Sequence, residues 1–221
     1  MGARHLIEVQ GRPVSVDTVF DRFPASVRGA VVVRALDREP HQIRLIGAEV
    51  VAAHDLGRTI QPVSAEHATV DVAPHREVLI PFDVPFAGLG PGWYCVVAEV
   101  EVDGGAHLRG PEDGGKRFVV PWPSAEVRRG DLRPGLEVGG AVIERVELKA
   151  DRTAVRWRPP ADAPDANLRL RLGTRRLPVV EVTEERGIRT TVAHPVPKRA
   201  TQLDLEVAAG RRRAATALDL S

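Results

Sequence analysis

Apolar and polar side chains alternate with a period of two through most of this chain. In the stretch 94–103, one parity is apolar from residue 96 to residue 102, and the other carries acids at 99, 101 and 103. This pattern predicts a strand with one buried face. The same alternation, or a short apolar run, predicts further strands over 5–10, 14–20, 27–36, 42–53, 68–72, 77–84 and 118–120.

No segment sustains a period of 3.6, so we expect little helix, although residues 44–54 also fit a helix. The run Ala30–Val33 is apolar throughout and predicts a strand covered on both faces. Residues 54–64 have a loop-like composition, and the glycine-rich stretch 104–115 is expected to be the loop of a hairpin.

The polar stretch 124–135 has no apolar period and ends in Pro134-Gly135, which is typical of a domain boundary. Beyond it the alternation starts again, most clearly where leucines at 168, 170 and 172 alternate with arginines at 169 and 171. The sequence therefore predicts an all-β fold of two tandem immunoglobulin-like or arrestin-like β-sandwich domains. The expected boundaries are 1–123 for the first domain, 124–135 for a linker and 136–221 for a smaller second sandwich.

Composition and charge narrow the choice of function. The chain has 221 residues, is 43% hydrophobic and has a formal net charge of +1. Residues 1–123 carry 12 basic and 16 acidic side chains, and residues 124–221 carry 19 and 14. An excess of five positive charges without an aromatic-interleaved basic motif does not favour nucleic acid. The chain has no apolar run long enough for a membrane span, and MGARHLIEVQ lacks a secretory pattern, so a cytoplasmic location is expected.

Three pieces of the first half resemble, in order, the bacterial sporulation-control family, whose members have an arrestin-like fold. The matching pieces are VDTVF at Val16–Phe20, PASVRGAV at Pro24–Val31, and IPFDVP at Ile80–Pro85 followed by EVEV at Glu99–Val102 and FVVP at Phe118–Pro121. The resemblance covers most of residues 14–123. The second piece lacks the first Gly and the Glu of the arrestin-type Pro-Gly-Glu-x-Val-x-Gly-x-Val stretch, and Gly110–Gly115 replaces the family's Asp-Pro-Thr-Asp segment. In the second half, Val155–Pro160 (VRWRPP) looks like the second strand of a fibronectin type III domain.

The family resemblance implies a non-enzymatic regulatory or scaffolding protein that binds protein partners, uses no cofactor and serves sporulation or development control. The alternative is a ligand- or carbohydrate-binding accessory sandwich, which would need a cluster of exposed aromatic residues, and Trp93, Trp122 and Trp157 are the only tryptophans of the chain. An enzyme is the third reading, and the chain has neither a Gly-x-Ser-x-Gly nor a His-Glu-x-x-His motif.

One segment is apolar on both parities and is therefore a candidate interface. Trp93, Cys95 and Val97 occupy the parity that turns acidic only at Glu99. With Trp122, after which the second domain begins, these residues form the predicted interface, and we expect the second domain or a homodimer partner to cover it.

Candidate chemistry is sparse. Cys95 is the only cysteine, which excludes an internal disulfide and favours a core thiol, and the seven histidines lack metal-ligand spacing. The acids Glu99, Glu101 and Asp103 could bind calcium, but a solvated sheet face is the favoured interpretation. For Arg156, Arg158, Arg169 and Arg171 the alternatives are a surface for an acidic partner and a solvated face paired with Glu181, Asp204 and Glu206, and the solvated face is favoured.

Overall fold

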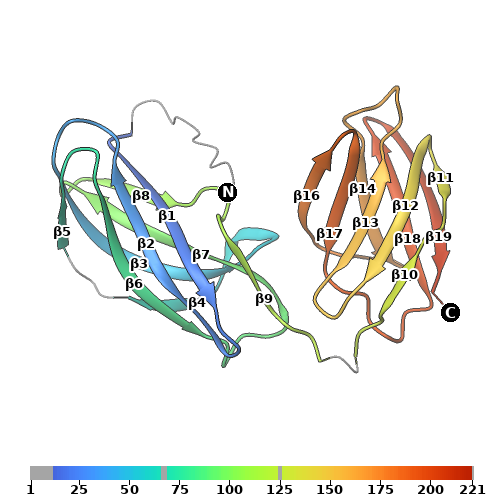
Figure 1. The fold of residues 1–221 in the computed structure, drawn as a ribbon, viewed down its shortest axis with the longest axis horizontal. Helices are drawn as coiled ribbons and strands as arrows, with labels where there is room; N and C mark the ends of the chain where they lie inside the picture. Colours follow the sequence, from blue (N-terminus) through green and yellow to red (C-terminus); the bar gives the residue numbers. More distant parts are fainter. Residues whose placement is uncertain (1–11, 66–68, 124–125, 221) are drawn as a thin grey trace. The chain divides into compact units, whose positions relative to one another are not determined.

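A computed structural model describes residues 12–65, 69–123 and 126–220. Over these ranges the chain is all β, with antiparallel sheets and no helix (Figure 1), which confirms the predicted fold class. The strand expected over 5–10 lies outside the described residues. The chain divides into two compact units. The first contains the described residues up to Leu89 and Tyr94–Phe118; the second contains Gly90–Trp93 and the described residues from Val119 onward.

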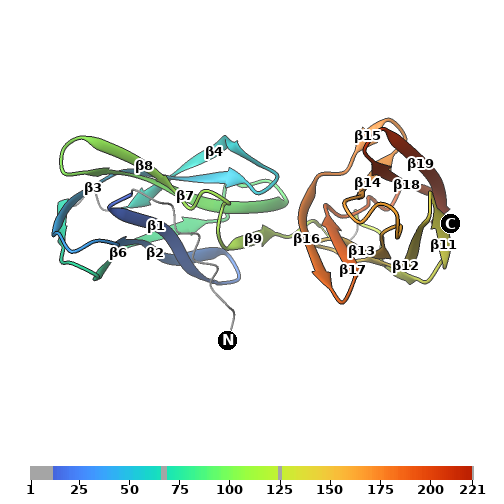
Figure 2. The ribbon, with the colours of Figure 1, turned by 90° about the horizontal axis from the view of Figure 1, so that it is seen from above.

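The first sandwich is built from nine strands that form one hydrogen-bonded network. They are β1 (Val14–Arg22), β2 (Ser26–Ala35), β3 (His41–Ala52), β4 (Asp55–Ala65), β5 (Thr69–Val72), β6 (Glu77–Pro85), β7 (Gly92–Val102), β8 (Ala106–Gly110) and β9 (Arg117–Val120). The network folds into two layers because β4 pairs with β3 along most of its length and with β6 only at Ser64 and Ala65. Figure 2 shows β4, β7 and β8 in one layer and β1, β2 and β6 in the other.

Alternation along the strands places the core between these layers. In β6, Ile80, Phe82 and Val84 are buried and the residues between them are exposed. Aromatic rings pack together at one end of the core. The ring centroid of Phe118 lies 5.8 Å from that of Phe20, in an edge-to-face contact, and 5.7 Å from that of Tyr94. Such contacts contribute about 1 kcal/mol each beyond simple burial.

Two segments expected as loops contain strands. Residues 54–64 form most of β4, and β8 lies within the stretch 104–115. Both strands are mostly exposed and contain few apolar residues, so their pairing with β3 and β7 relies on backbone hydrogen bonds that leave little trace in the sequence. The competing helix over 44–54 is wrong, because β3 runs to Ala52.

The second sandwich has ten strands in two sheets. They are β10 (Gly130–Leu132), β11 (Leu136–Val138), β12 (Ala141–Leu148), β13 (Thr153–Arg158), β14 (Asn167–Leu172), β15 (Arg175–Arg176), β16 (Val179–Glu185), β17 (Ile188–Ala193), β18 (Gln202–Ala209) and β19 (Arg212–Asp219). The order β12-β13-β17-β16 in one sheet and β14-β18-β19 in the other is the A-B-E-D and C-F-G order of a constant-type immunoglobulin sandwich.

The core of the second unit contains Trp157, which is only 1% exposed. Its Nε1–H donates to Thr191 Oγ1 at 3.0 Å, so the buried indole has a hydrogen-bond partner. The predicted alternation in β14 is confirmed, because Leu168 and Leu170 are buried and face this core.

From residue 126 onward, the expected linker 124–135 is not a free spacer. Val127 bridges to Pro197, and β10 pairs with the end of β12. The second sandwich therefore begins before residue 136. The residues that begin this sandwich are held by backbone pairing and by single side chains. The sequence therefore shows no apolar period there.

Candidate binding site: the Trp122 pocket

The second unit contains a surface cavity of about 440 Å³. This volume lies within the range of pockets that bind small ligands or side chains. Its lining comes from residues far apart in the sequence: Trp122, Glu126 and Val127 on one side, and Pro195, Pro197, Lys198 and Arg199 on the other. We call this cavity the Trp122 pocket.

Backbone pairing holds the two segments together. The Arg128 N–H donates to the Val196 carbonyl oxygen at 2.9 Å, and the Lys198 N–H donates to that of Glu126 at 2.8 Å. The Arg128 guanidinium also donates to the carbonyl oxygens of Lys198, at 3.0 Å, and of Leu220. These contacts fix the pocket walls without a regular strand pair.

Trp122 forms the aromatic part of the lining. Its ring packs edge to face against the His194 ring, with centroids 5.2 Å apart and planes at 68°. Trp122 is half-buried, and no hydrogen bond from its Nε1–H is found among the described residues. Pro195 is buried and Pro197 is half-buried, so flat, rigid rings make up much of the remaining apolar wall.

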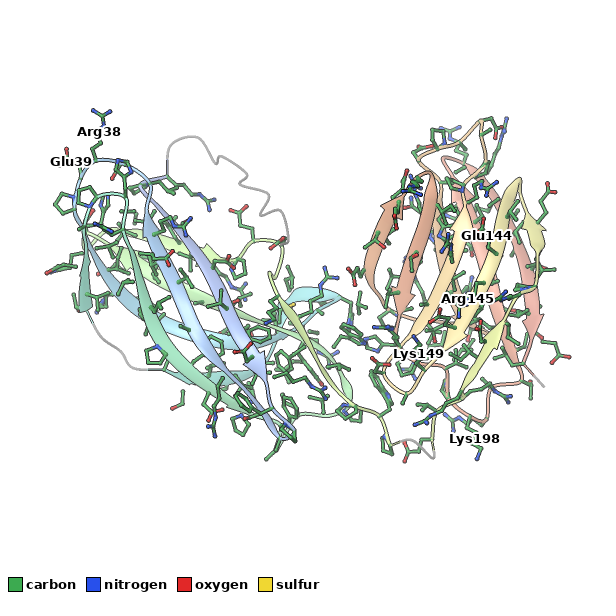
Figure 3. The ribbon with its side chains drawn as sticks, viewed as in Figure 1. Arg38, Glu39, Glu144, Arg145, Lys149 and Lys198 are labelled. Atoms are coloured by element: carbon green, nitrogen blue, oxygen red, sulfur yellow. The ribbon has the colours of Figure 1, made fainter. Side chains whose placement is uncertain are left out.

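Charged side chains surround the opening. Lys198 extends from the end of the second unit, away from its sheets (Figure 3), and Arg199 follows it. Both are exposed, as is Glu126. Within the part of the chain that the structure describes, none of the three takes part in an ion pair or a side-chain hydrogen bond. Two cations, Lys198 and Arg199, and one anion, Glu126, therefore lie at the pocket rim without a charged partner among the described residues.

The four predicted interface residues do not share one environment. Trp93 and Trp122 belong to the second unit, whereas Cys95 and Val97 lie in the first and are 0% and 3% exposed. A Cβ built at Gly114 would lie 3.0 Å from Cys95 Sγ and 2.8 Å from Leu56, so the chain of the first unit itself covers this thiol. The expectation that Cys95 belongs to an interface is wrong for this reason. Burial raises the pKa of the Cys95 thiol to about 11.

The four predicted arginines divide into two separate groups, each around one glutamate. Arg156 and Arg158 on β13 contact Glu144 at 3.2 and 3.0 Å, and Figure 3 shows Glu144 on β12.

Arg169 and Arg171 on β14 contact Glu206 at 3.2 and 3.5 Å. Pairing with Glu206 was expected, but pairing with Glu144 was not. Each group is partly neutralised by its glutamate, which supports the solvated, charge-paired face over the acidic-partner surface.

The acidic side chains on one face of β7 also have charged partners. Glu99 contacts His107 at 3.0 Å, Glu101 contacts Arg44, and Asp103 contacts His41 at 2.7 Å. No group of three or more His, Cys, Asp or Glu side chains with metal-binding geometry occurs among the described residues. The contacts support the solvated, charge-paired face over the calcium alternative.

His41, a buried histidine that the sequence did not single out, lies between two carboxylates. Its Nε2 lies 2.8 Å from Asp37 Oδ1, and its Nδ1 lies 2.7 Å from Asp103 Oδ2. These hydrogen bonds raise the pKa of His41 and lower those of both carboxyl groups. His41 thus joins the turn that contains Asp37 to the turn that contains Asp103. Because both of its ring nitrogens are hydrogen-bonded, it is not free to act as a general base.

The outer face of the layer β1, β2 and β6 has an apolar centre. Val31 and Val33 point into the core, but Val32 lies on the outer face beside Leu79, which is 57% exposed. Val19, on the same face, is 41% exposed. The valines of the run are thus buried on both faces, as expected, with Val32 only 9% exposed, whereas its neighbours Leu79 and Val19 on the outer face are exposed in the described part of the chain.

A scan of protein-family models and a search of curated proteins found no match to this chain. No helix among the described residues is long and apolar enough to cross a membrane.

Proposed function

We propose that this chain is a non-enzymatic interaction protein, acting as a regulatory or scaffolding component in the cytoplasm, and that it binds a segment of a partner protein in the Trp122 pocket. The observation that carries the proposal is the combination, in one cavity, of a half-buried indole, two proline rings and uncommitted charges. Pockets with apolar walls and a few polar groups are the usual ligand sites of proteins, and tryptophan and arginine are enriched among residues that dominate binding energy.

The chemistry of the lining supports binding. The residues that line the pocket include no serine, threonine or cysteine, and their titratable groups are exposed at the rim. Nucleophilic catalysis needs a nucleophile within hydrogen-bond reach of a base, and neither Lys198 nor Glu126, the lining groups that could act as nucleophiles, makes a side-chain hydrogen bond among the described residues. The resemblance of residues 14–123 to the arrestin-like sporulation-control family also supports a scaffolding role.

Selection from a displayed library of random 12-residue peptides tests this proposal. We expect enriched peptides to bind the unaltered protein and the Phe23→Ala variant equally. Phe23 is the matched control because it is an exposed aromatic residue, at 44%, in the first unit. The Trp122→Ala variant should bind at least about tenfold more weakly, as expected for a central aromatic contact.

A second measurement does not depend on the folding of a variant. In the unaltered protein, a bound peptide should shift the indole N–H resonance of Trp122 and leave that of the buried Trp157 in place. Failure to enrich any peptide, or equal binding by Trp122→Ala, would overturn the proposal. Binding of a neutral oligosaccharide that shifts the same resonance would instead support the carbohydrate-binding alternative.

A further inference from the structure

We infer that the Trp122 pocket selects a proline-containing segment with an acidic side chain next to the proline. This inference rests on the proposed function and adds the chemistry of the ligand. Shape, hydrogen-bonding capacity and charge of the pocket each point to this class.

Shape is the first argument. Trp122, Pro195 and Pro197 offer flat, rigid surfaces, and these are the surfaces on which proline rings pack. A proline-rich segment is already extended as a polyproline II helix, so it loses little conformational entropy when it docks on an aromatic groove. A flexible aliphatic segment would lose more.

Hydrogen-bonding capacity is the second argument. The backbone carbonyl oxygens of Glu126, Val196, Pro197 and Lys198 already accept hydrogen bonds from the chain itself. Pro195 and Pro197 have no backbone N–H, and the side chains of the lining offer three donor groups without a partner among the described residues, the indole of Trp122, the ammonium of Lys198 and the guanidinium of Arg199, against one acceptor, the carboxylate of Glu126. Their complement is a ligand rich in acceptors and poor in donors. Proline residues fit because they present a carbonyl oxygen and no N–H.

Charge is the third argument. Lys198 and Arg199 are adjacent, exposed and without an ion-pair partner in the described residues, and Glu126 offsets only one of them. A carboxylate on the ligand would make charge-assisted hydrogen bonds with these donors, which are stronger than neutral ones. The free carboxylate of Glu126 disfavours a ligand with several acids in a row, so one acid between prolines fits best.

Three capped peptides of equal length test the inference by calorimetry: repeats of Pro-Pro-Glu, of Pro-Pro-Gln and of Ala-Ala-Glu. We expect the Pro-Pro-Glu peptide to bind at least about fivefold more tightly than the Pro-Pro-Gln peptide and about tenfold more tightly than the Ala-Ala-Glu peptide. The Lys198→Gln/Arg199→Gln double variant should remove the preference for Glu over Gln, because the substituted side chains still donate hydrogen bonds but carry no charge. Because both substituted residues are exposed, the variant is expected to fold, and 1 M salt provides the same test without substitution.

The outcomes separate this inference from the proposed function. Equal binding of the Glu and Gln peptides, or of the Pro and Ala peptides, would overturn the inference, while library peptides that require Trp122 would still support a binding pocket. Malonate alone binding as tightly as the Pro-Pro-Glu peptide would show a small-anion site and overturn it as well. If no peptide from any source reaches the pocket, the inference and the proposed function both fail.

Discussion

His41 and Asp103 are joined by a 2.7 Å hydrogen bond although 62 positions separate them in the sequence. Asp103 adopts a left-handed backbone conformation, with φ of 52°, at the turn between β7 and β8. Its second oxygen accepts the Gln42 N–H at 2.8 Å, which ties the turn to the start of β3. With Asp37 on its other nitrogen, the His41 ring is held between two carboxylates.

This arrangement predicts a stability that depends on pH. The pKa of His41 is raised by hydrogen bonds to Asp103 and Asp37. The stabilisation is therefore fully present below the unfolded-state pKa of 6.5 and is lost as pH rises through the higher folded-state value. The pKa values of Asp37 and Asp103 are lowered from 3.8, so their contribution is present above pH 3.8 and is lost as pH falls through the lower folded-state values.

We expect the His41→Gln variant to be destabilised most between about pH 4 and 6.5 and to approach the unaltered protein at pH 9. Amide hydrogen exchange in β3 at pH 5.5 and pH 9 measures the difference, with rates corrected for the intrinsic pH dependence. If the difference in exchange protection between His41→Gln and the unaltered protein were the same at both pH values, the ion-pair interpretation would be contradicted.

Gly29→Ala should destabilise the first unit by about 2 kcal/mol or more, as overpacking does. A Cβ at Gly29 would lie 1.9 Å from the Val19 carbonyl oxygen, so the backbone of β1 would have to move. Gly47→Ala is the control, because no atom lies within 4 Å of the added carbon there, and its effect should stay within about 0.5 kcal/mol. Equal effects of the two substitutions in thermal unfolding would count against the packing of β1 on β2.

Two buried threonines should respond oppositely to replacement by valine. Thr18 Oγ1 donates to the Val96 carbonyl oxygen at 3.1 Å and links β1 to β7, so Thr18→Val should cost about 1 kcal/mol. Thr153 is fully buried, and its hydroxyl has no partner in the described structure. Thr153→Val should therefore be neutral or stabilising. Chemical denaturation of both variants tests the pair, and a loss of stability in Thr153→Val would show that its hydroxyl is bonded.

Cys95 should react with a thiol reagent only when the first unit opens. Burial raises its pKa to about 11, so the thiol stays protonated at pH 8, and reactivity requires the thiolate. We expect labelling at pH 8 to be slow in buffer and to accelerate in parallel with unfolding in urea. Rapid labelling of the folded protein would show that the thiol is accessible.

The sequence by itself determined the strands that carry a regular apolar parity. The alternation in β6, β7 and β14 predicts both the strand and its buried face, because successive side chains of a strand point to opposite sides. It also predicted that the four arginines of β13 and β14 face outward. The absence of a helical period predicted the all-β class.

Only the tertiary structure decided which groups meet. Strands β4, β8 and β10 pair chiefly through their backbones, which are the same for every sequence. Glu144 reaches Arg156 and Arg158 at a register shift between β12 and β13, and a shift of this kind leaves no sequence pattern. The Trp122 pocket combines residues of the expected linker with residues about 70 positions away, and the two parts are joined by the backbone bridge between Val127 and Pro197 and by the Arg128 side chain. Side-chain alternation reports which face of a strand is buried, but it contains no information about which distant segment lies against it.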